Sequence, residues 1–150
     1  MYTKQETAVL KQEFWTALGR YLSPIPSADG NKINWINYKT GVRNIYFRMG
    51  ADNNRAFVCI EISHPDEETR LKFFQHFQRF PGFFHMYEAV WNWEKNTEMN
   101  GRHISRIFQV IRDVNLFERS DWPMLISFFK TRMLELDKFW SENKVIFEII

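Results

Sequence analysis

Apolar residues recur at helical spacing at both ends of the chain. Near the N-terminus they stand three or four positions apart, at Leu10, Phe14, Trp15, Leu18, Tyr21 and Leu22. This spacing places them on one face of an amphipathic helix, which the proline-containing segment 23–27 ends. Near the C-terminus Ser120 or Asp121 is the expected cap of a long last helix, with Pro123 in its first turn and an apolar stripe over 125–140. The pattern therefore predicts a helix at each end.

The part of the chain between these helices has the pattern of strands. Three runs rich in β-branched and aromatic residues are separated by Thr40-Gly41 and by 52–54, and they cover 32–39, 42–50 and 55–64. They predict a three-stranded β-meander. A two-residue hairpin loop at Thr40-Gly41 places Ile36 opposite Ile45 in this prediction.

The second half of the chain predicts one more helix and a second hairpin. Pro65 ends the meander, and the acidic residues 66–68 favour the start of a helix that continues to Pro81. Segments 89–95 and 103–111 then flank the turn-like pair Asn100-Gly101. The apolar spacing in 103–111 is also compatible with a helix, but we expect a strand. The predicted fold class is α+β, one domain over 1–150 with an antiparallel sheet packed by about three helices, in the order α-βββ-α-ββ-α.

Composition excludes several classes of protein. The 150 residues include 15 Phe, 6 Trp and 5 Tyr with 25% charged residues, which is enough ring surface to exclude a disordered chain. A net charge of +2 gives no whole-molecule field that implies nucleic acid or an anionic membrane as a partner. The chain begins with no apolar signal region and contains no membrane-length apolar run, so we expect a cytoplasmic protein with no membrane partner. Cys59 is the only cysteine, which excludes an intrachain disulfide, and we expect it to be buried.

Catalytic signatures are sparse. The sequence has none of the common nucleotide, hydrolase or zinc-protease motifs, and its four histidines lack metal-ligand spacing, so we predict no structural metal and no cofactor. One alternative comes from the order of elements, which is also that of the restriction-endonuclease-like core. Such nucleases hold a divalent cation with an Asp or Glu and a Glu-x-Lys motif. Asp52 and Glu61 stand roughly where those carboxylates would lie, and Glu13 on the first helix is a possible third. Only this nuclease alternative requires a divalent cation. The lysine is missing, and a hairpin tip at 52–54 would pair Glu61 with Arg43 instead.

A second candidate site is one face of the first predicted hairpin. It combines rings, amides and cations that could stack nucleobases and hold phosphates, namely Trp35, Asn37, Lys39, Asn44, Tyr46 and Arg48. The competing interpretation is that helices cover this face and make it core, because apolar residues of the third strand, from Ala56 to Ile62, lie beside it.

A series of phenylalanines marks the middle of the chain, at Phe73, Phe74, Phe77, Phe80, Phe83 and Phe84. Such a stripe is expected to be core. It is wider than one helix needs to face a sheet. Any of these phenylalanines that stay exposed could form the interface of a homodimer.

Several short sequence segments resemble those of a bacterial family that is catalogued only as a domain of unknown function. They are Phe14-Trp15, the run 35–41, Asn44-Ile45-Tyr46-Phe47-Arg48, Trp122-Pro123 and the run 136–140. The resemblance covers nearly the whole chain. It implies a bacterial cytoplasmic protein, because members of that family stand alone at this length or follow another domain, in some cases one that resembles a restriction nuclease. It supplies no catalytic residues and only a loose association with DNA metabolism or defence.

The sequence therefore predicts a binding or accessory domain, with a link to nucleic-acid metabolism or defence. Two alternatives stay open. One is a metal-dependent nuclease or a degenerate descendant of one, and the other is a structural homodimerisation domain.

Overall fold

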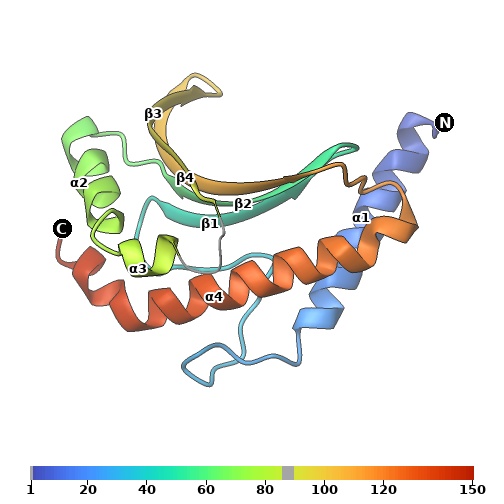
Figure 1. The fold of residues 1–150 in the computed structure, drawn as a ribbon, viewed down its shortest axis with the longest axis horizontal. Helices are drawn as coiled ribbons and strands as arrows, with labels where there is room; N and C mark the ends of the chain where they lie inside the picture. The colour runs from blue at the N-terminus through green and yellow to red at the C-terminus, as the bar shows by residue number, and fades with distance from the viewer. Residues whose placement is uncertain (1, 86–89) are drawn as a thin grey trace.

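The computed structural model describes residues 2–85 and 90–150 and shows a curved four-stranded antiparallel sheet with helices on one face (Figure 1). In chain order the elements are α1 (Lys4–Leu22), β1 (Ile45–Ala51), β2 (Arg55–Ile62), α2 (Glu67–Phe77), α3 (Pro81–Phe84), β3 (Asn92–Met99), β4 (Arg102–Arg112), the 3-10 helix η2 (Arg119–Asp121) and α4 (Trp122–Glu148). The predicted α+β class is confirmed, and so are the helices at both ends of the chain.

The sheet consists of two hairpins joined side by side, in the order β1-β2-β4-β3. The inner strands β2 and β4 pair antiparallel, with Ile60 opposite Ile107. The second predicted hairpin is confirmed, since Asn100 and Gly101 have φ angles of 53° and 77° between β3 and β4. Two consecutive positive φ angles are typical of the tight turn that matches strand twist. Segment 103–111 is a strand, whereas the predicted start of its partner at Ala89 lies outside the described residues.

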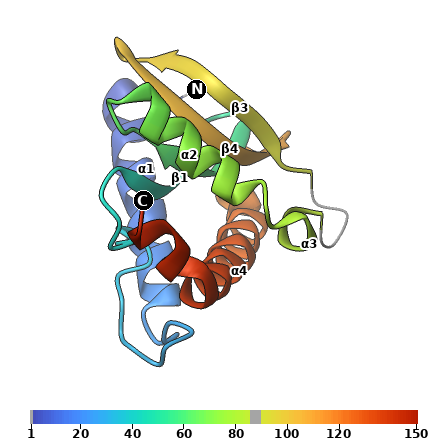
Figure 2. The same ribbon diagram turned by 90° about the vertical axis from the view of Figure 1, so that its left-hand side faces the viewer.

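The helices cover one face of the sheet and enclose an aromatic core (Figure 2). On β2 the residues that face them, Ala56, Val58, Ile60 and Ile62, are fully buried. Phe77 on α2 lies at the centre of the aromatic cluster, with its ring centroid 4.4 Å from that of Phe147 and 6.3 Å from those of Phe84 and Trp140. The phenylalanine series is therefore core, as expected, with Phe80 and Phe83 packed against it while partly exposed.

The predicted strand over 32–39 is wrong, and the meander has two strands instead of three. Residues 23–44 contain no helix or strand. Asn34 Oδ1 accepts hydrogen bonds from the backbone N–H groups of Ile36 and Asn37 at 3.1 Å, which folds this segment into a turn. Residues 32–39 form no strand and Ile45 pairs with Ile62, so the predicted hairpin at Thr40-Gly41 and the pairing of Ile36 with Ile45 do not form.

The segment 23–44 is instead attached to α4, and we call it the anchored loop. Asp137 on α4 accepts hydrogen bonds from Ala28 N and from the Tyr38 hydroxyl, both at 2.7 Å. One turn further along α4, Trp140 Nε1 donates to the carbonyl oxygen of Thr40 at 2.7 Å. Trp35 is only 2% exposed, and its indole N–H donates to Ile25 O. These bonds explain why a segment with strand-forming residues is held away from the sheet.

The caps of the helices follow the sequence in one case and depart from it in another. Asp66 caps α2 by accepting from Thr69 N at 3.0 Å. Asp121 occupies the cap position of α4, but its side chain accepts from Asn115 N instead of capping the helix.

Within the described residues, no helix has the length and apolar character needed to cross a membrane.

Candidate functional site

The face of the sheet opposite the helices is uncovered and concave (Figure 1). We call it the open face. Strand register places on it every second residue of β1, β2 and β4 together with partners on β3, and its central members are Tyr46, Arg48, Phe57, Cys59, Glu61, Asn92, Glu94, Arg106 and Phe108. An antiparallel sheet with one covered and one open face normally carries polar residues on the open side. This face carries charged and aromatic residues instead of a uniform polar surface.

Two neighbouring rows of side chains cross the sheet here. One row contains Tyr46, Glu61, Arg106 and Glu94, which lie opposite one another on β1, β2, β4 and β3. The next row contains Arg48, Cys59, Phe108 and Asn92. Each arginine therefore has a carboxylate and an aromatic ring as neighbours.

Arg48 is fixed on β1 by two contacts. Its Nε lies 3.0 Å from Oε1 of Glu61, and its guanidinium carbon lies 4.4 Å from the centroid of the Tyr46 ring. The Arg48 side chain is nevertheless 50% exposed. The ion pair and the cation–π contact orient the guanidinium while leaving half of its surface to solvent.

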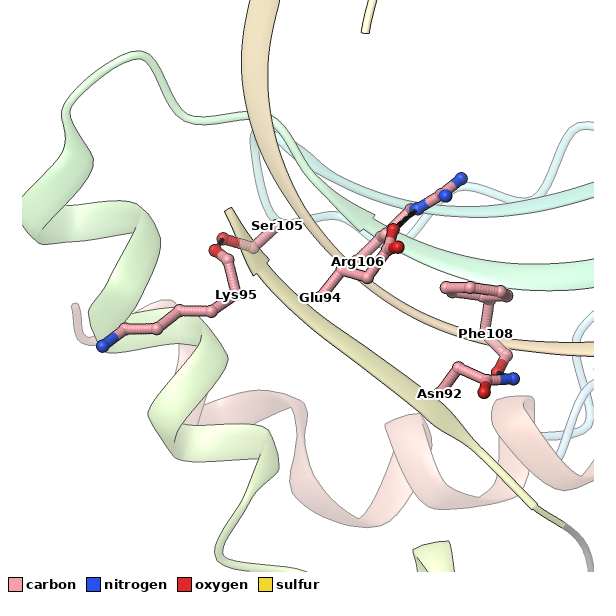
Figure 3. Close-up of polar contacts among 6 residues, drawn as sticks. All are labelled: Asn92, Glu94, Lys95, Ser105, Arg106 and Phe108. Carbon is pink, nitrogen blue, oxygen red and sulfur yellow. Dashed lines mark hydrogen bonds and ion pairs between the residues drawn. The ribbon is translucent and has the colours of Figure 1, made fainter. Parts of the chain in front are cut away.

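Arg106 repeats this arrangement on β4. Its Nε forms an ion pair with Glu94, and its guanidinium carbon lies 4.5 Å from the centroid of the Phe108 ring (Figure 3). Nδ2 of Asn92 donates to the carbonyl oxygen of Phe108 at 3.3 Å and ties the strands together there. Among the residues that the structure describes, the terminal nitrogens of Arg106 and Arg48 have no hydrogen-bond partner. Both guanidinium groups can therefore bind an anion with their outer edge.

The aromatic rings of the open face are accessible from solvent. Tyr46 is 38% exposed, and Phe57 and Phe108 are half-buried. Phe57 lies over Gly50, where an added Cβ would come within 2.3 Å of the Phe57 ring. The missing side chain at Gly50 thus leaves room for the Phe57 ring against the neighbouring strand.

Cys59 lies in the middle of this face and is buried beneath its neighbours, as expected from the sequence. Burial raises the pKa of the Cys59 thiol to about 12, and the nearby charge of Glu61 acts in the same direction. The thiol is therefore protonated at neutral pH and is not an activated nucleophile.

The six residues predicted to form a nucleic-acid face do not lie together. Tyr46 and Arg48 are on the open face, and their expected proximity is confirmed by the 4.4 Å contact. Trp35 belongs to the core, which overturns its part in an exposed platform. The remaining three lie on or next to the anchored loop, away from the sheet face, namely Asn37, Lys39 and Asn44. The division follows from the missing first strand, because only residues after 44 enter the sheet.

The three carboxylates considered for a nuclease site each have a separate structural role. Glu13 forms an ion pair with Arg119. Asp52 holds the turn between β1 and β2, accepting from the N–H groups of Asn54 and Arg55 at 2.9 Å, and these bonds hold its pKa below the ordinary value. Glu61 lies opposite Tyr46 and pairs with Arg48, so its predicted pairing with Arg43 is wrong.

These carboxylates are too far apart to share one cation. Asp52 contacts Arg55 at the start of β2, and Glu61 lies six residues further along that strand, which corresponds to about 20 Å. Over residues 2–85 and 90–150, no group of three or more His, Cys, Asp or Glu side chains is arranged to hold a metal ion. The geometry gives no support to metal-dependent cleavage by Glu13, Asp52 and Glu61.

The open face includes residues that sequence reasoning missed, chiefly Phe57, Arg106 and Phe108. A signal for them was present. Charged or aromatic residues alternate with buried apolar residues along both strands, as Arg55, Phe57 and Glu61 do on β2. The missing information was the partner of β2, which is β4 and not the segment 32–39.

Comparison with known proteins gives one match. The model of the family described as "Domain of unknown function (DUF4268)" matches residues 10–144. No curated protein and no solved structure matched the chain.

Proposed function

The chain belongs to the DUF4268 family, whose description assigns no activity, and we propose from the geometry of the open face that the protein is a binding module for single-stranded nucleic acid. The observation that carries this proposal is the pair of arginine–aromatic stacks, Arg48 on Tyr46 and Arg106 on Phe108, in which the arginine side chains are 50% and 29% exposed. Sequence-tolerant binding of single strands combines such cations with aromatic stacking platforms.

The arginines supply the contacts to phosphate. In each stack the contact with a glutamate uses Nε, at 3.0 Å for Arg48, and the terminal nitrogens point away from that bond. A guanidinium held in this way presents two donors to a phosphate without losing further rotamer freedom. Arg55 and Arg112 lie opposite each other at the start of β2 and extend the row of cations toward the rim of the sheet.

The rings supply the contacts to bases. Tyr46, Phe57 and Phe108 come from three adjacent strands, and strands lie about 4.8 Å apart, so the rings form a surface on which successive bases can stack. The sheet curves toward this face (Figure 1), so its strands turn toward a ligand bound there. A duplex hides its base faces, so the proposal favours single strands over duplexes.

The test is a titration with fluorescently labelled oligonucleotides of about 12 nucleotides, a length within the usual site size of single-strand binding domains. Anisotropy is measured for DNA and RNA single strands and for the corresponding duplexes. We expect the single strands to bind more tightly than the duplexes, with an affinity that falls as salt rises.

Matched variants test whether binding occurs at this face or through nonspecific attraction to the protein surface. Phe108→Leu keeps an apolar side chain and removes the ring, and it should weaken binding roughly 5-fold or more, because stacking on one ring contributes about 1–3 kcal/mol. Arg48→Gln keeps a donor near Glu61 and removes the charge. The controls are Tyr21→Leu and Arg20→Gln, two exposed residues near the end of α1 on the side away from the open face (Figure 1). Equal affinities for the face variants and their controls, or no binding by the unmodified protein, would overturn the proposal.

The broader setting that the sequence suggests is part of this proposal. A bacterial cytoplasmic protein with a single-strand binding face would serve DNA metabolism or defence as an accessory module to another protein that carries out cleavage. Co-purification of the endogenous protein with a nuclease would support that role.

A further inference from the structure

A cavity that is separate from the open face lies between the anchored loop and α4. Its volume is about 490 Å³, which is within the range of small-molecule sites. The loop and α4 lie on the far side of the core from the open face (Figure 1), so the two sites do not overlap. Irregular loops as long as 23–44 are uncommon in compact domains and are often functional.

The inner wall of this cavity contains a buried carboxylate. Asp137 is 5% exposed, and each of its oxygens accepts one hydrogen bond at 2.7 Å, from Ala28 N and from the Tyr38 hydroxyl. A carboxylate oxygen has two lone pairs, so capacity remains for a donor from a ligand. Trp140 and Thr40 complete this wall, and the bond from Trp140 Nε1 to Thr40 O keeps the loop in place.

The outer part of the cavity is cationic. Lys32, Lys39 and Lys144 all line it together with one exposed carboxylate, Asp29, so over the whole cavity the three lysines outnumber the two aspartates by one. None of the ion pairs between described residues includes any of these three lysines. Lys144 is half-buried, and its ammonium group lies over Gly41, where an added Cβ would come within 2.5 Å of Nζ. Three ammonium groups beside a single outer carboxylate, Asp29, leave the outer part with a net positive charge, which favours an anionic ligand.

We propose that this cavity binds a nucleoside monophosphate, with the phosphate held by Lys39 and Lys144 and the ribose hydroxyls donating to Asp137. The proposal follows from the division of charge within the cavity. A ligand with a phosphate at one end and hydroxyl donors at the other matches ammonium groups at the outer part and a carboxylate on the inner wall. A simple anion would leave the remaining acceptor capacity of Asp137 unused, and an uncharged nucleoside would leave the lysines without an anionic partner.

Isothermal titration calorimetry on the full chain tests the ligand class. The probes are the four ribonucleoside 5′-monophosphates, adenosine and inorganic phosphate. We expect at least one monophosphate to bind about 10-fold more tightly than adenosine or phosphate, because both ends of the ligand contribute. Absence of heat for all four monophosphates up to about 5 mM, or equal binding of inorganic phosphate, would overturn the proposal.

A ligand analogue tests the role of Asp137 without changing the residue that holds the loop. The 2′,3′-dideoxy form of the monophosphate that binds lacks both ribose donors, and we expect it to bind about 10-fold more weakly to the unmodified protein. Equal binding of the dideoxy form contradicts the assignment of the hydroxyls to Asp137.

Lysine variants test the phosphate end. Lys39→Gln combined with Lys144→Gln should weaken binding about 10-fold or more, whereas Lys138→Gln, an exposed residue of the same helix outside the cavity, should leave it unchanged. Arg48→Gln on the open face should also leave nucleotide binding unchanged, which separates this site from the proposed nucleic-acid surface. Unchanged affinity in the double lysine variant refutes the site.

Discussion

Asp137 is predicted to be the main attachment of the anchored loop. It joins Ala28 and Tyr38, which lie 109 and 99 residues away in the chain, through two hydrogen bonds of 2.7 Å. A hydrogen bond to a charged group contributes roughly 1.5–3 kcal/mol, and its loss here leaves a partly buried donor unsatisfied. Since Asp137 is only 5% exposed, Asp137→Ala should lower the free energy of unfolding by about 3–5 kcal/mol. That is a large fraction of the 5–15 kcal/mol typical of a domain.

Urea unfolding followed by tryptophan fluorescence measures this change. Asp137→Asn retains one acceptor for the two donors, so its cost should be about half that of the alanine variant. Glu142→Ala, an exposed carboxylate on the same helix, is the matched control and should change stability by less than about 0.5 kcal/mol. A double-mutant cycle with Tyr38→Phe isolates the side-chain pair and should give a coupling of about 1–2 kcal/mol. A cost below about 1 kcal/mol for Asp137→Ala would refute this account of the loop.

The same pair predicts a loss of stability at alkaline pH. Burial, followed by the hydrogen bond to Asp137 and the charge of that carboxylate, raises the pKa of Tyr38 far above its ordinary value. The folded state therefore holds the Tyr38 proton more tightly than the unfolded state. The contribution of this proton is complete below the unfolded pKa of about 10 and is lost as pH rises beyond it. Urea midpoints above pH 10 should fall less steeply in Tyr38→Phe than in the unmodified protein, and identical slopes would contradict the assignment.

Three further predictions concern the remaining parts of the fold. Cys59, with its pKa near 12, should react with a thiol reagent at neutral pH only after unfolding in guanidinium, and fast labelling of the folded protein would contradict its burial. Hydrogen bonds lower the pKa of Asp52 and Asp66 in the folded state, so their contribution to stability is present above about pH 4 and is lost as pH falls below it. The double Asn variant should flatten that acid limb of the urea midpoint. Gly41→Ala should cost about 1–2 kcal/mol because φ is +78°, whereas Gly82→Ala, at a site with open space, should cost nothing measurable in the same assay.

Elements whose signals are local could be predicted from the sequence. The first and last helices follow from apolar spacing, and the buried residues of α1 include the predicted Leu10, Phe14 and Leu18. The hairpin around Asn100-Gly101 follows from the turn chemistry of these two residues. In each case the residues that decide the structure lie within one or two turns of the element that they form.

The anchored loop could not be predicted in this way. Trp35 and Tyr38 have high strand propensity, and the prediction of a strand over 32–39 followed that propensity. Their partners decide otherwise, because Tyr38 bonds to Asp137 and Thr40 accepts from Trp140 about a hundred residues later. Propensity is a weak preference that tertiary hydrogen bonds of this strength override. The cavity beside α4 therefore could not be predicted from the sequence either.

Only part of the open face could be predicted from the sequence. Tyr46 and Arg48 were identified from alternation on one strand, but their neighbours depend on strand order. With the segment 32–39 absent from the sheet, β2 has β4 as its second partner, which brings Arg106 and Phe108 beside Cys59 and Glu61. Strand order is set by packing of the whole sheet on the helices, and alternation within a strand does not encode it.

The charges of the open face also bear on what can cover it. An apolar partner surface, such as a second copy placed face to face, would take Arg48 and Arg106 out of water together with their glutamates. Burying an ion pair costs several kcal/mol per ion unless new hydrogen bonds satisfy the free nitrogens. A phosphate backbone provides such bonds to the terminal nitrogens that the glutamates leave unused, while bases occupy the rings. The proposed ligand, a polyanion with flat apolar groups, would therefore satisfy the arginine nitrogens that an apolar partner would leave without hydrogen bonds.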